Sequence, residues 1–183
     1  MQIVTRVILR LLAACLFAVM VAAPCFADDL RLEETKIKAG LLYNFLKYTE
    51  WPATTAKTSG LHICLYGGDP FAGTLSSLDG KTAQQSRISV STVYTLDHIL
   101  SCNAIIIDAS AESAVPDILR FAEENSILTF SDMPGFAKQG GMVEFARRNE
   151  RIQIVVNTAA ANSARLQISP RLLKLALAVG GRP

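Results

Sequence analysis

Apolar residues recur along this chain with two spacings, one typical of helices and one typical of strands. Residues 28–48 carry apolar positions every three or four residues and predict an amphipathic helix, which ends near Pro52 because proline disfavours helix at its predecessor. Short β-rich runs predict strands at residues 61–66, 87–93, 104–108 and 127–130. Short helices are expected between them, at residues 71–78, 96–100 and 116–124. Such alternation predicts right-handed crossovers and a mainly parallel sheet covered on both sides.

The C-terminal part of the chain predicts a different connection. β-rich runs at residues 142–146 and 152–156 flank a charged connector at 147–151, a pattern typical of a hairpin. The basic residues of this connector form either a solvated turn or a contact for an acidic partner. Asn157 is expected to cap an Ala-rich helix, and a leucine-rich helix is expected to follow Ser169. The predicted fold class is α/β, a three-layer α/β/α sandwich whose mainly parallel central sheet carries a C-terminal antiparallel hairpin at one edge.

A polar, glycine-rich segment at residues 132–141, called the glycine loop below, joins two of the predicted strands. It contains Pro134, Gly135 and Phe136, and proline and glycine favour a turn over a helix. Loops between core strands commonly present functional residues. Two interpretations therefore stand. The loop is either a working surface or a structural turn whose glycines need positive φ and whose Phe136 fills the core.

The first 27 residues differ from the rest of the chain. Arg6 and Arg10 precede an apolar run at residues 11–23, and Ala27 is followed directly by acidic residues. This is the layout of a cleavable secretory signal peptide with cleavage after Ala27. An uncleaved membrane anchor is the alternative, but the apolar run is short for a membrane span. We expect a signal peptide at residues 1–27, a single domain at residues 28–183 and export to the periplasm.

Loss of the signal peptide changes the charge balance. The chain has 18 Lys+Arg against 16 Asp+Glu, and the two arginines of the signal are removed with it. The expected mature chain is therefore neutral. A balanced surface argues against nucleic acid and against anionic lipid as the partner.

Export also bears on the cysteines. Cys15 and Cys25 lie in the expected signal peptide, which leaves Cys64 and Cys102 in the mature chain. Two cysteines in an oxidising compartment are expected to form a disulfide. Closing a loop of that length would contribute about 4 kcal/mol by the chain-entropy estimate. Two buried thiols that pack as small apolar residues are the alternative.

The polar residues form no recognisable catalytic set. Neither His62 nor His98 is beside a plausible nucleophile, and the motifs of common hydrolases and zinc proteases are missing from the sequence. We predict no enzyme activity, no metal and no cofactor. Asp69, Asp108 and Asp132 follow predicted parallel strands, the end at which open α/β sheets bind ligands. They predict a ligand crevice, although aspartate is equally common as a turn former and helix cap.

Four sequence blocks resemble the YfiR-like family of bacterial periplasmic proteins. They are KAGLLYNFLKYTEWP at residues 38–52, GDPF at 68–71, TFSDMPGFAKQGGMVEF at 129–145 and a final serine followed by a leucine-rich stretch. With the remaining matches, the resemblance covers nearly the whole mature chain. It implies an exported α/β domain without catalysis. It also places Cys64 and Cys102 where the family has a bonded pair, whereas a second pair found in some members is missing here near residues 143–154.

The resemblance further implies a function. The namesake of the family is a repressor that binds the periplasmic part of an inner-membrane diguanylate cyclase and lowers cyclic-di-GMP, and an outer-membrane OmpA-like lipoprotein can sequester it. The resemblance thus predicts a periplasmic regulatory protein. We expect its contact surface to be apolar and exposed, and to include Trp51, Pro134, Gly135 and Phe136. A small-molecule binding domain is the alternative function, and a homodimer is an expected assembly.

Overall fold

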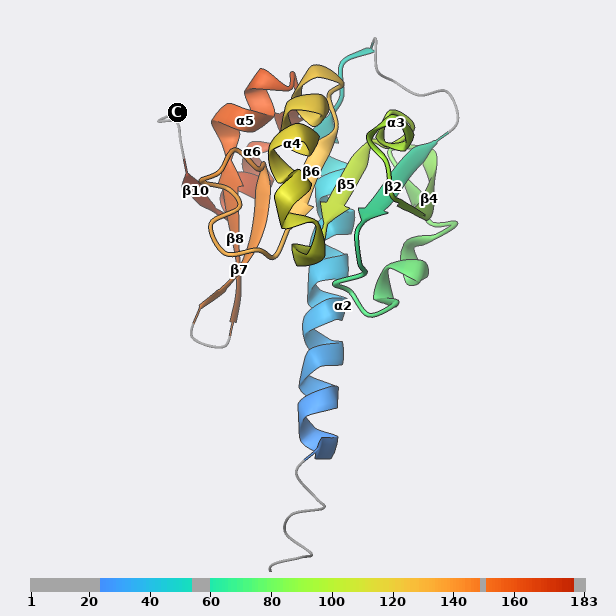
Figure 1. Cartoon of the computed structure of the whole chain (residues 1–183), viewed down its shortest axis with the longest axis vertical. Helices are drawn as coiled ribbons and strands as arrows, with labels where there is room; N and C mark the ends of the chain where they lie inside the picture. The colour runs from blue at the N-terminus through green and yellow to red at the C-terminus, as the bar shows by residue number, and fades with distance from the viewer. Residues whose placement is uncertain (1–23, 54–59, 149–150, 180–183) are drawn as a thin grey trace, which may run out of the picture. The chain divides into compact units, whose positions relative to one another are not determined.

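The computed structural model describes residues 24–53, 60–148 and 151–179 (Figure 1). The expected signal peptide falls mainly outside these residues, and so does the tip of the predicted hairpin, residues 149–150. The chain divides into two compact units, one ending at Glu34 and one beginning at Thr35. Helix α2 (Pro24–Tyr48) supplies the described part of the first unit and opens the second. Everything below concerns the second unit.

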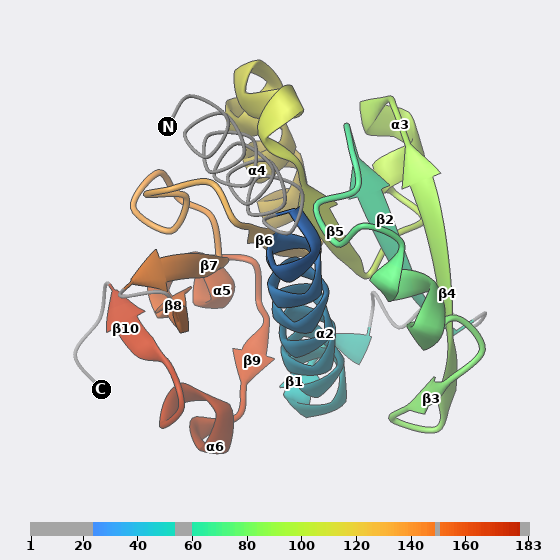
Figure 2. The ribbon, with the colours of Figure 1, turned by 90° about the horizontal axis from the view of Figure 1, so that it is seen from below.

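An eight-stranded sheet forms the centre of this unit, in the order β10-β8-β7-β6-β5-β2-β4-β3. β3 and β10 lie at its opposite ends (Figure 2). Neighbouring strands pair in parallel except at β7–β8 and β3–β4. The strands are β2 (Leu61–Tyr66), β3 (Thr82–Ala83), β4 (Ser86–Val93), β5 (Ala104–Ile107), β6 (Leu128–Ser131), β7 (Val143–Arg148), β8 (Arg151–Asn157) and β10 (Leu177–Val179). The predicted mainly parallel sheet with an antiparallel hairpin is confirmed.

Apolar side chains fill the space on both faces of the sheet. In β5, Ala104 and Ile106 belong to one core and Ile105 and Ile107 to the other, because successive side chains of a strand point to opposite faces. The first core includes α2, where Phe45 packs edge-on against Phe130 of β6 with ring centroids 5.6 Å apart. The second lies under α4, which the figure shows in front of the strands (Figure 1). These two cores confirm the three-layer sandwich.

The helices after α2 are short. Among the described residues they comprise the 3-10 helices η2 (Thr74–Leu78) and η3 (Ala109–Ala114) and the α-helices α3 (Leu96–Ile99), α4 (Val115–Glu124), α5 (Thr158–Ser163) and α6 (Pro170–Leu173). The predicted cap of α5 is confirmed, because the Asn157 side chain accepts a hydrogen bond from the backbone N–H of Ala160 at 3.0 Å. The predicted helix at residues 71–78 forms only its last part, as η2.

The C-terminal segment departs from the prediction. The leucine-rich helix ends at Leu173, and the chain then returns as β10, which pairs in parallel with Val155–Asn157 of β8. The ladder with β8 covers a strand edge that β8 would otherwise leave open. A second small sheet joins β1 (Thr49–Glu50) to β9 (Gln167–Ile168) in antiparallel register. It holds the end of α2 against the segment that follows α5.

Candidate functional site

Asp69 and Asp108 follow β2 and β5, as the sequence predicted, and both serve as local backbone acceptors. The Asp69 carboxylate accepts hydrogen bonds from the N–H groups of Phe71 at 2.8 Å and Gly73 at 2.7 Å. The Asp108 carboxylate accepts one from the N–H of Ser110 at 2.9 Å and so caps η3. The hydrogen bond from the Ser110 side chain, helped by backbone donors and opposed by partial burial, lowers the pKa of Asp108. These two carboxylates build the turns at the strand ends.

Asp132 has a different environment. Its carboxylate lies 3.1 Å from the Nζ atom of Lys38, whose side chain is only 7% exposed on α2. This ion pair joins α2 to the first residue of the glycine loop. Asp132 also lines a pocket that neither Asp69 nor Asp108 lines. A single ligand crevice for all three carboxylates therefore stays a prediction, and this pocket does not support it.

Glu144 fixes the backbone of the glycine loop, and the sequence analysis did not select this residue. Glu144 lies in β7 and is 6% exposed. One of its carboxylate oxygens accepts a hydrogen bond from the N–H of Gly135 and the other from the N–H of Ala137, both at 3.0 Å. The Asn157 side chain adds a bond from Nδ2 to the carbonyl oxygen of Ala137 at 2.9 Å. The place of Glu144 between the apolar residues Val143 and Phe145 was the sequence signal for a buried carboxylate, which needs hydrogen-bond partners.

Phe136 points into the protein, so the expectation that it is exposed is wrong. Its side chain is 1% exposed and belongs to the core under α4. A turn with a hydrogen bond from the N–H of Phe136 to the carbonyl of Met133 directs the chain inward. The ring lies so close to Gly141 that a Cβ placed there would be 2.2 Å from it. The alternative interpretation from the sequence, in which Phe136 fills the core, is confirmed.

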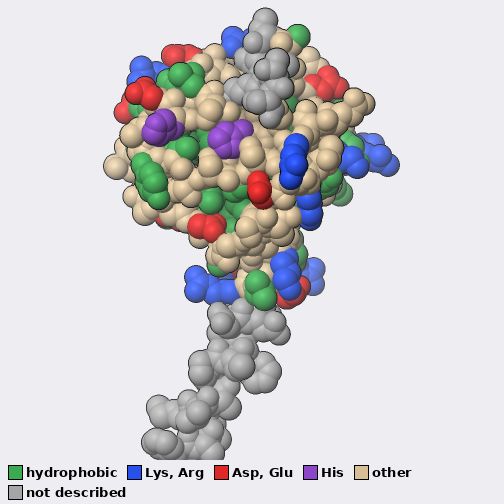
Figure 3. Space-filling model, turned by 90° about the vertical axis from the view of Figure 1, so that its right-hand side faces the viewer, with side chains coloured by type: hydrophobic (Ala, Val, Ile, Leu, Met, Phe, Trp, Pro, Cys, Tyr) green, Lys and Arg blue, Asp and Glu red, His purple; other side chains and the backbone are tan. Residues whose placement is uncertain are grey.

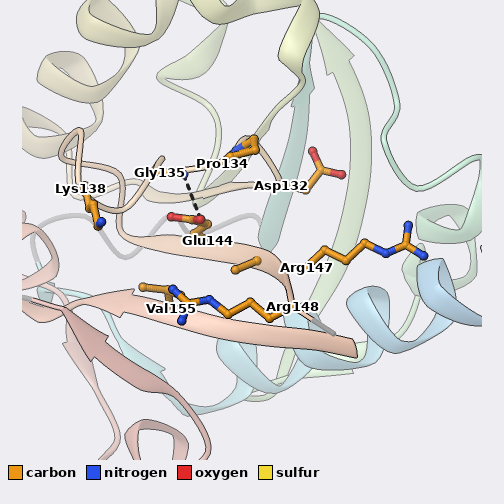
Figure 4. Close-up of a pocket in the computed structure, with 9 residues that line it drawn as sticks. Asp132, Pro134, Gly135, Lys138, Glu144, Arg147, Arg148 and Val155 are labelled. Carbon is orange, nitrogen blue, oxygen red and sulfur yellow. Dashed lines mark hydrogen bonds between the residues drawn. The ribbon is translucent and has the colours of Figure 1, made fainter. Parts of the chain in front are cut away.

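Pro134 and Gly135 lie at the surface and line a pocket between the glycine loop and the β7–β8 hairpin (Figure 4). The pocket has a volume of about 330 Å³. Its lining residues are Asp132, Pro134, Gly135, Lys138, Glu144, Ala146, Arg147, Arg148 and Val155. This set is called the loop pocket below. It brings together one predicted crevice residue, two predicted contact residues and the first two arginines of the basic connector.

The lining of the loop pocket has more basic than acidic side chains. Lys138, Arg147 and Arg148 are exposed cations, and Figure 4 shows the two arginine side chains diverging from β7. Of its two carboxylates, Asp132 pairs with Lys38 and Glu144 accepts backbone hydrogen bonds. The pocket thus has a basic rim above two carboxylates that already have partners within the protein, and such a rim favours an anionic ligand or an acidic segment of a partner.

Trp51 lies elsewhere and does not line the loop pocket. It is half-buried against the core on the α2 side. Its indole Nε1 is buried, and no acceptor among the described residues is within hydrogen-bond reach of it. The structure therefore separates Trp51 from the other predicted contact residues.

Cys64 and Cys102 form a disulfide with their Cα atoms 5.9 Å apart. Cys64 is in β2, and Cys102 comes directly before Asn103 and the neighbouring strand β5. Both cysteines are completely buried. The bond confirms the predicted pairing and ties the central strand β2 to the turn that precedes β5.

The structure is a disulfide-bonded α/β domain with a pocket of about 330 Å³ at its surface. The chain belongs to the YfiR/HmsC-like family, whose profile matches residues 35–177. Family membership supports a periplasmic regulatory role in general. Within the described ranges, no helix has both the length and the apolar character needed to cross a membrane.

Solved structures resemble the fold at low sequence identity. A conserved domain protein from Vibrio cholerae O1 biovar El Tor matches with a TM-score of 0.51 and 12% identity, over 79% of this chain and 59% of that chain. The ABC domain from Streptococcus pneumoniae, solved in complex with L-Trp, matches with a TM-score of 0.49 and 12% identity, over 80% of this chain and 60% of that one. The present chain thus spans about three fifths of each structure's length. A search of curated proteins found no match.

Proposed function

We propose that this protein is a periplasmic regulator that binds the periplasmic sensory part of an inner-membrane signalling protein and represses it. A diguanylate cyclase is the first candidate target, so that binding lowers cyclic-di-GMP. Membership of the YfiR/HmsC-like family supports the general role. Repression is then a population shift, in which the regulator binds the inactive state of its target more tightly than the active state.

The loop pocket is the observation that suggests which residues contact the partner. Pro134 and Gly135 are presented on a loop whose backbone is fixed by the Glu144 carboxylate. A fixed backbone loses little conformational entropy on binding. The exposed Lys138 and Arg148 side chains beside it favour an acidic partner segment. We therefore place the principal partner contact at the loop pocket and leave Phe136 out of it.

The proposal also covers the compartment in which the protein acts and its further partners. The disulfide between two completely buried cysteines supports an oxidising compartment. Export through the signal peptide at residues 1–27 and regulation without catalysis complete the proposal. An OmpA-like lipoprotein of the outer membrane is the proposed second partner, which would compete for the regulator, and a homodimer is the proposed assembly.

The direct test is the cyclic-di-GMP content of cells that lack the gene. Deletion should raise the cyclic-di-GMP level, and restoration of the full chain with its signal peptide should lower it again. A chain without the signal peptide, expressed to the same level, should not restore it, because it would not reach its target. An unchanged cyclic-di-GMP level in a deletion of a strain that expresses the protein would contradict repression of a cyclase.

A small-molecule binding domain is the second candidate function, and the loop pocket is what favours it. Its volume of about 330 Å³ falls in the range of small-ligand pockets. A bound ligand raises the unfolding midpoint by mass action, so a thermal-shift panel of nucleotides, amino acids and other small anions tests this function. A midpoint shift that Arg148→Ala abolishes would assign the ligand to this pocket.

A further inference from the structure

His62, Cys64 and Cys102 form a compact cluster of potential metal ligands. One ring nitrogen and the two sulfur atoms all lie within 4.8 Å of one another. His62 and Cys64 are two residues apart in β2, and residues at that spacing project from the same face of a strand. Cys102 reaches the same place from the turn that precedes β5. Histidine and cysteine in this combination are the ligands of thiophilic cations such as Zn²⁺ and Cu⁺.

The backbone around the cluster is fixed independently of the disulfide. The N–H of Asn103 donates to the carbonyl of His62 at 2.8 Å, and the N–H of His62 donates to Oδ1 of Asn103 at 2.9 Å. These two bonds hold Cys102 beside His62. The parallel pairing of β2 with β5 continues the same register through Cys64 and Ile105. The three side chains should therefore stay together when the sulfur–sulfur bond is opened.

The imidazole ring already has the surroundings of a metal-binding histidine. Its Nε2 lies 2.7 Å from the hydroxyl oxygen of Ser91, and its Nδ1 lies 3.3 Å from the carbonyl oxygen of Ser101. If one ring nitrogen binds an ion, the other retains a hydrogen bond that orients the ring, as is usual around protein-bound metals. His62 is half-buried, whereas both sulfur atoms belong to completely buried residues. Histidine side chains reach the surface on the face shown in Figure 3.

We propose that the reduced protein binds one thiophilic cation, typified by Zn²⁺, through Cys64, Cys102 and His62, so that disulfide and metal are alternative states of the same site. A dithiol reductant supplies two electrons and two protons, the Cys64–Cys102 bond breaks to give two thiols, and the reductant becomes a disulfide. The cation then binds two thiolates and one imidazole nitrogen and releases two protons to solvent. A water molecule would complete the tetrahedral coordination.

The required movements are small. Bonds of about 2.0–2.3 Å in a tetrahedral site place neighbouring ligand atoms about 3.5 Å apart. Opening the disulfide lets the two sulfur atoms separate to that distance. The imidazole, which lies within 4.8 Å of both sulfur atoms, has to approach them by about 1 Å. Rotation of side chains is sufficient for such a shift.

The test compares the oxidised and the reduced protein under anaerobic conditions. A phosphine reductant opens the disulfide and is then removed, and Zn²⁺ is titrated against a chromophoric chelator. We expect one equivalent of Zn²⁺ to bind the reduced protein and none to bind the oxidised protein. Co²⁺ used in place of Zn²⁺ should give the near-ultraviolet charge-transfer band of thiolate ligands, and Cys102→Ser should abolish this band.

A matched pair of histidine variants makes the test specific. His62→Gln should weaken Zn²⁺ binding by more than about tenfold, a loss that even an outer hydrogen-bond partner of a metal ligand can cause. His98→Gln should leave the affinity unchanged. Both histidines are close in sequence to a cysteine, so an unfolded reduced chain would use them alike. Equal losses in the two variants, or equal binding by the oxidised and reduced protein, would overturn the proposal whether or not circular dichroism shows the reduced protein to be folded.

Discussion

Single glycines show how the same substitution acts differently at two positions. A Cβ at Gly141 would lie 2.2 Å from the ring of Phe136, whereas a Cβ at Gly40, exposed on α2, would meet nothing within 4 Å. We expect Gly141→Ala to destabilise the protein by about 1–3 kcal/mol, because the ring must leave its place in the core. We expect Gly40→Ala to stabilise it by about 0.5–1 kcal/mol. Urea unfolding of both variants checks the signs, and a neutral Gly141→Ala would contradict the buried position of Phe136.

Asp108 links a single side chain to the pH dependence of stability. Its pKa is lowered in the folded protein, chiefly by the hydrogen bond from Ser110. A carboxyl group with a lowered folded pKa stabilises the protein above its unfolded pKa, and this stabilisation is lost as the pH falls through the folded value. Asp108→Asn keeps an acceptor for the η3 cap but removes the charge. Unfolding measured from neutral to acidic pH should therefore show a shallower loss of stability in Asp108→Asn than in the parent protein. Parallel profiles would contradict this assignment.

At the residue scale, the sequence predicted what depends on local chemistry. The Asn157 cap was predicted from an amide placed before an Ala-rich helix, and the cysteine pair was predicted from the expected export. The direction of Phe136 depends on a turn within the glycine loop, and the anchoring role of Glu144 depends on donors seven and nine residues away. No local pattern determines those contacts. They follow only once β7 has been placed beside β6.

At the scale of elements, the glycine loop owes its position to one buried carboxylate. Glu144→Gln replaces an acceptor oxygen by an NH₂ group, which would face the N–H of Gly135 or Ala137. A buried donor left without an acceptor costs about 1–3 kcal/mol, and we expect a loss of that size in urea unfolding. Hydrogen exchange should also become faster at the amides of Gly135 and Ala137. Glu123→Gln on the exposed side of α4 is the matched control and should change the free energy of unfolding by less than about 0.5 kcal/mol.

The disulfide joins two strands that already pair in parallel. We therefore expect the disulfide to act mainly on the unfolded chain. By the chain-entropy estimate, closing a loop of this length raises the free energy of the unfolded chain by about 4 kcal/mol. The double variant Cys64→Ala with Cys102→Ala should lose about 2–4 kcal/mol of unfolding free energy under oxidising conditions. Added reductant should lower the urea midpoint of the parent protein and leave that of the variant unchanged. A reductant effect of equal size on both proteins would show that the bond is not its target.

The elements that the sequence predicted well are those with a single strong pattern. The apolar run of β5 is buried on all four residues, as expected of a central parallel strand. The C-terminal stretch has no such unambiguous pattern, because Leu172, Leu175 and Val179 fit a helical stripe. The strand at Leu177–Val179 forms because β8 offers an open edge, and that edge exists only after the hairpin has docked. Long-range pairing therefore overrides local helix preference there.

At the scale of the whole molecule, the regulatory proposal depends on the charge of one surface. Lys138 and Arg148 are exposed at the loop pocket. On the face shown in Figure 3, basic and acidic side chains are both present. An acidic partner segment would be attracted to the pocket and repelled after charge reversal, since like charges across an interface cost affinity and slow association. Lys138→Glu with Arg148→Glu should therefore weaken partner binding by about tenfold or more.

The control for charge reversal is Arg120→Glu, which changes an exposed arginine of α4 whose side chain is 70% accessible and pairs with Asp117 in its own helix. We expect equal export and similar urea midpoints for the parent protein, the pocket variant Lys138→Glu with Arg148→Glu, and the control Arg120→Glu. Exposed substitutions rarely alter the free energy of unfolding by more than about 0.5 kcal/mol. In a deletion strain, Arg120→Glu should restore a low cyclic-di-GMP level and the pocket variant should not. If both variants repress, the contact surface lies outside the loop pocket. If neither represses although both fold, net charge rather than a particular surface governs binding, and the proposed contact is wrong.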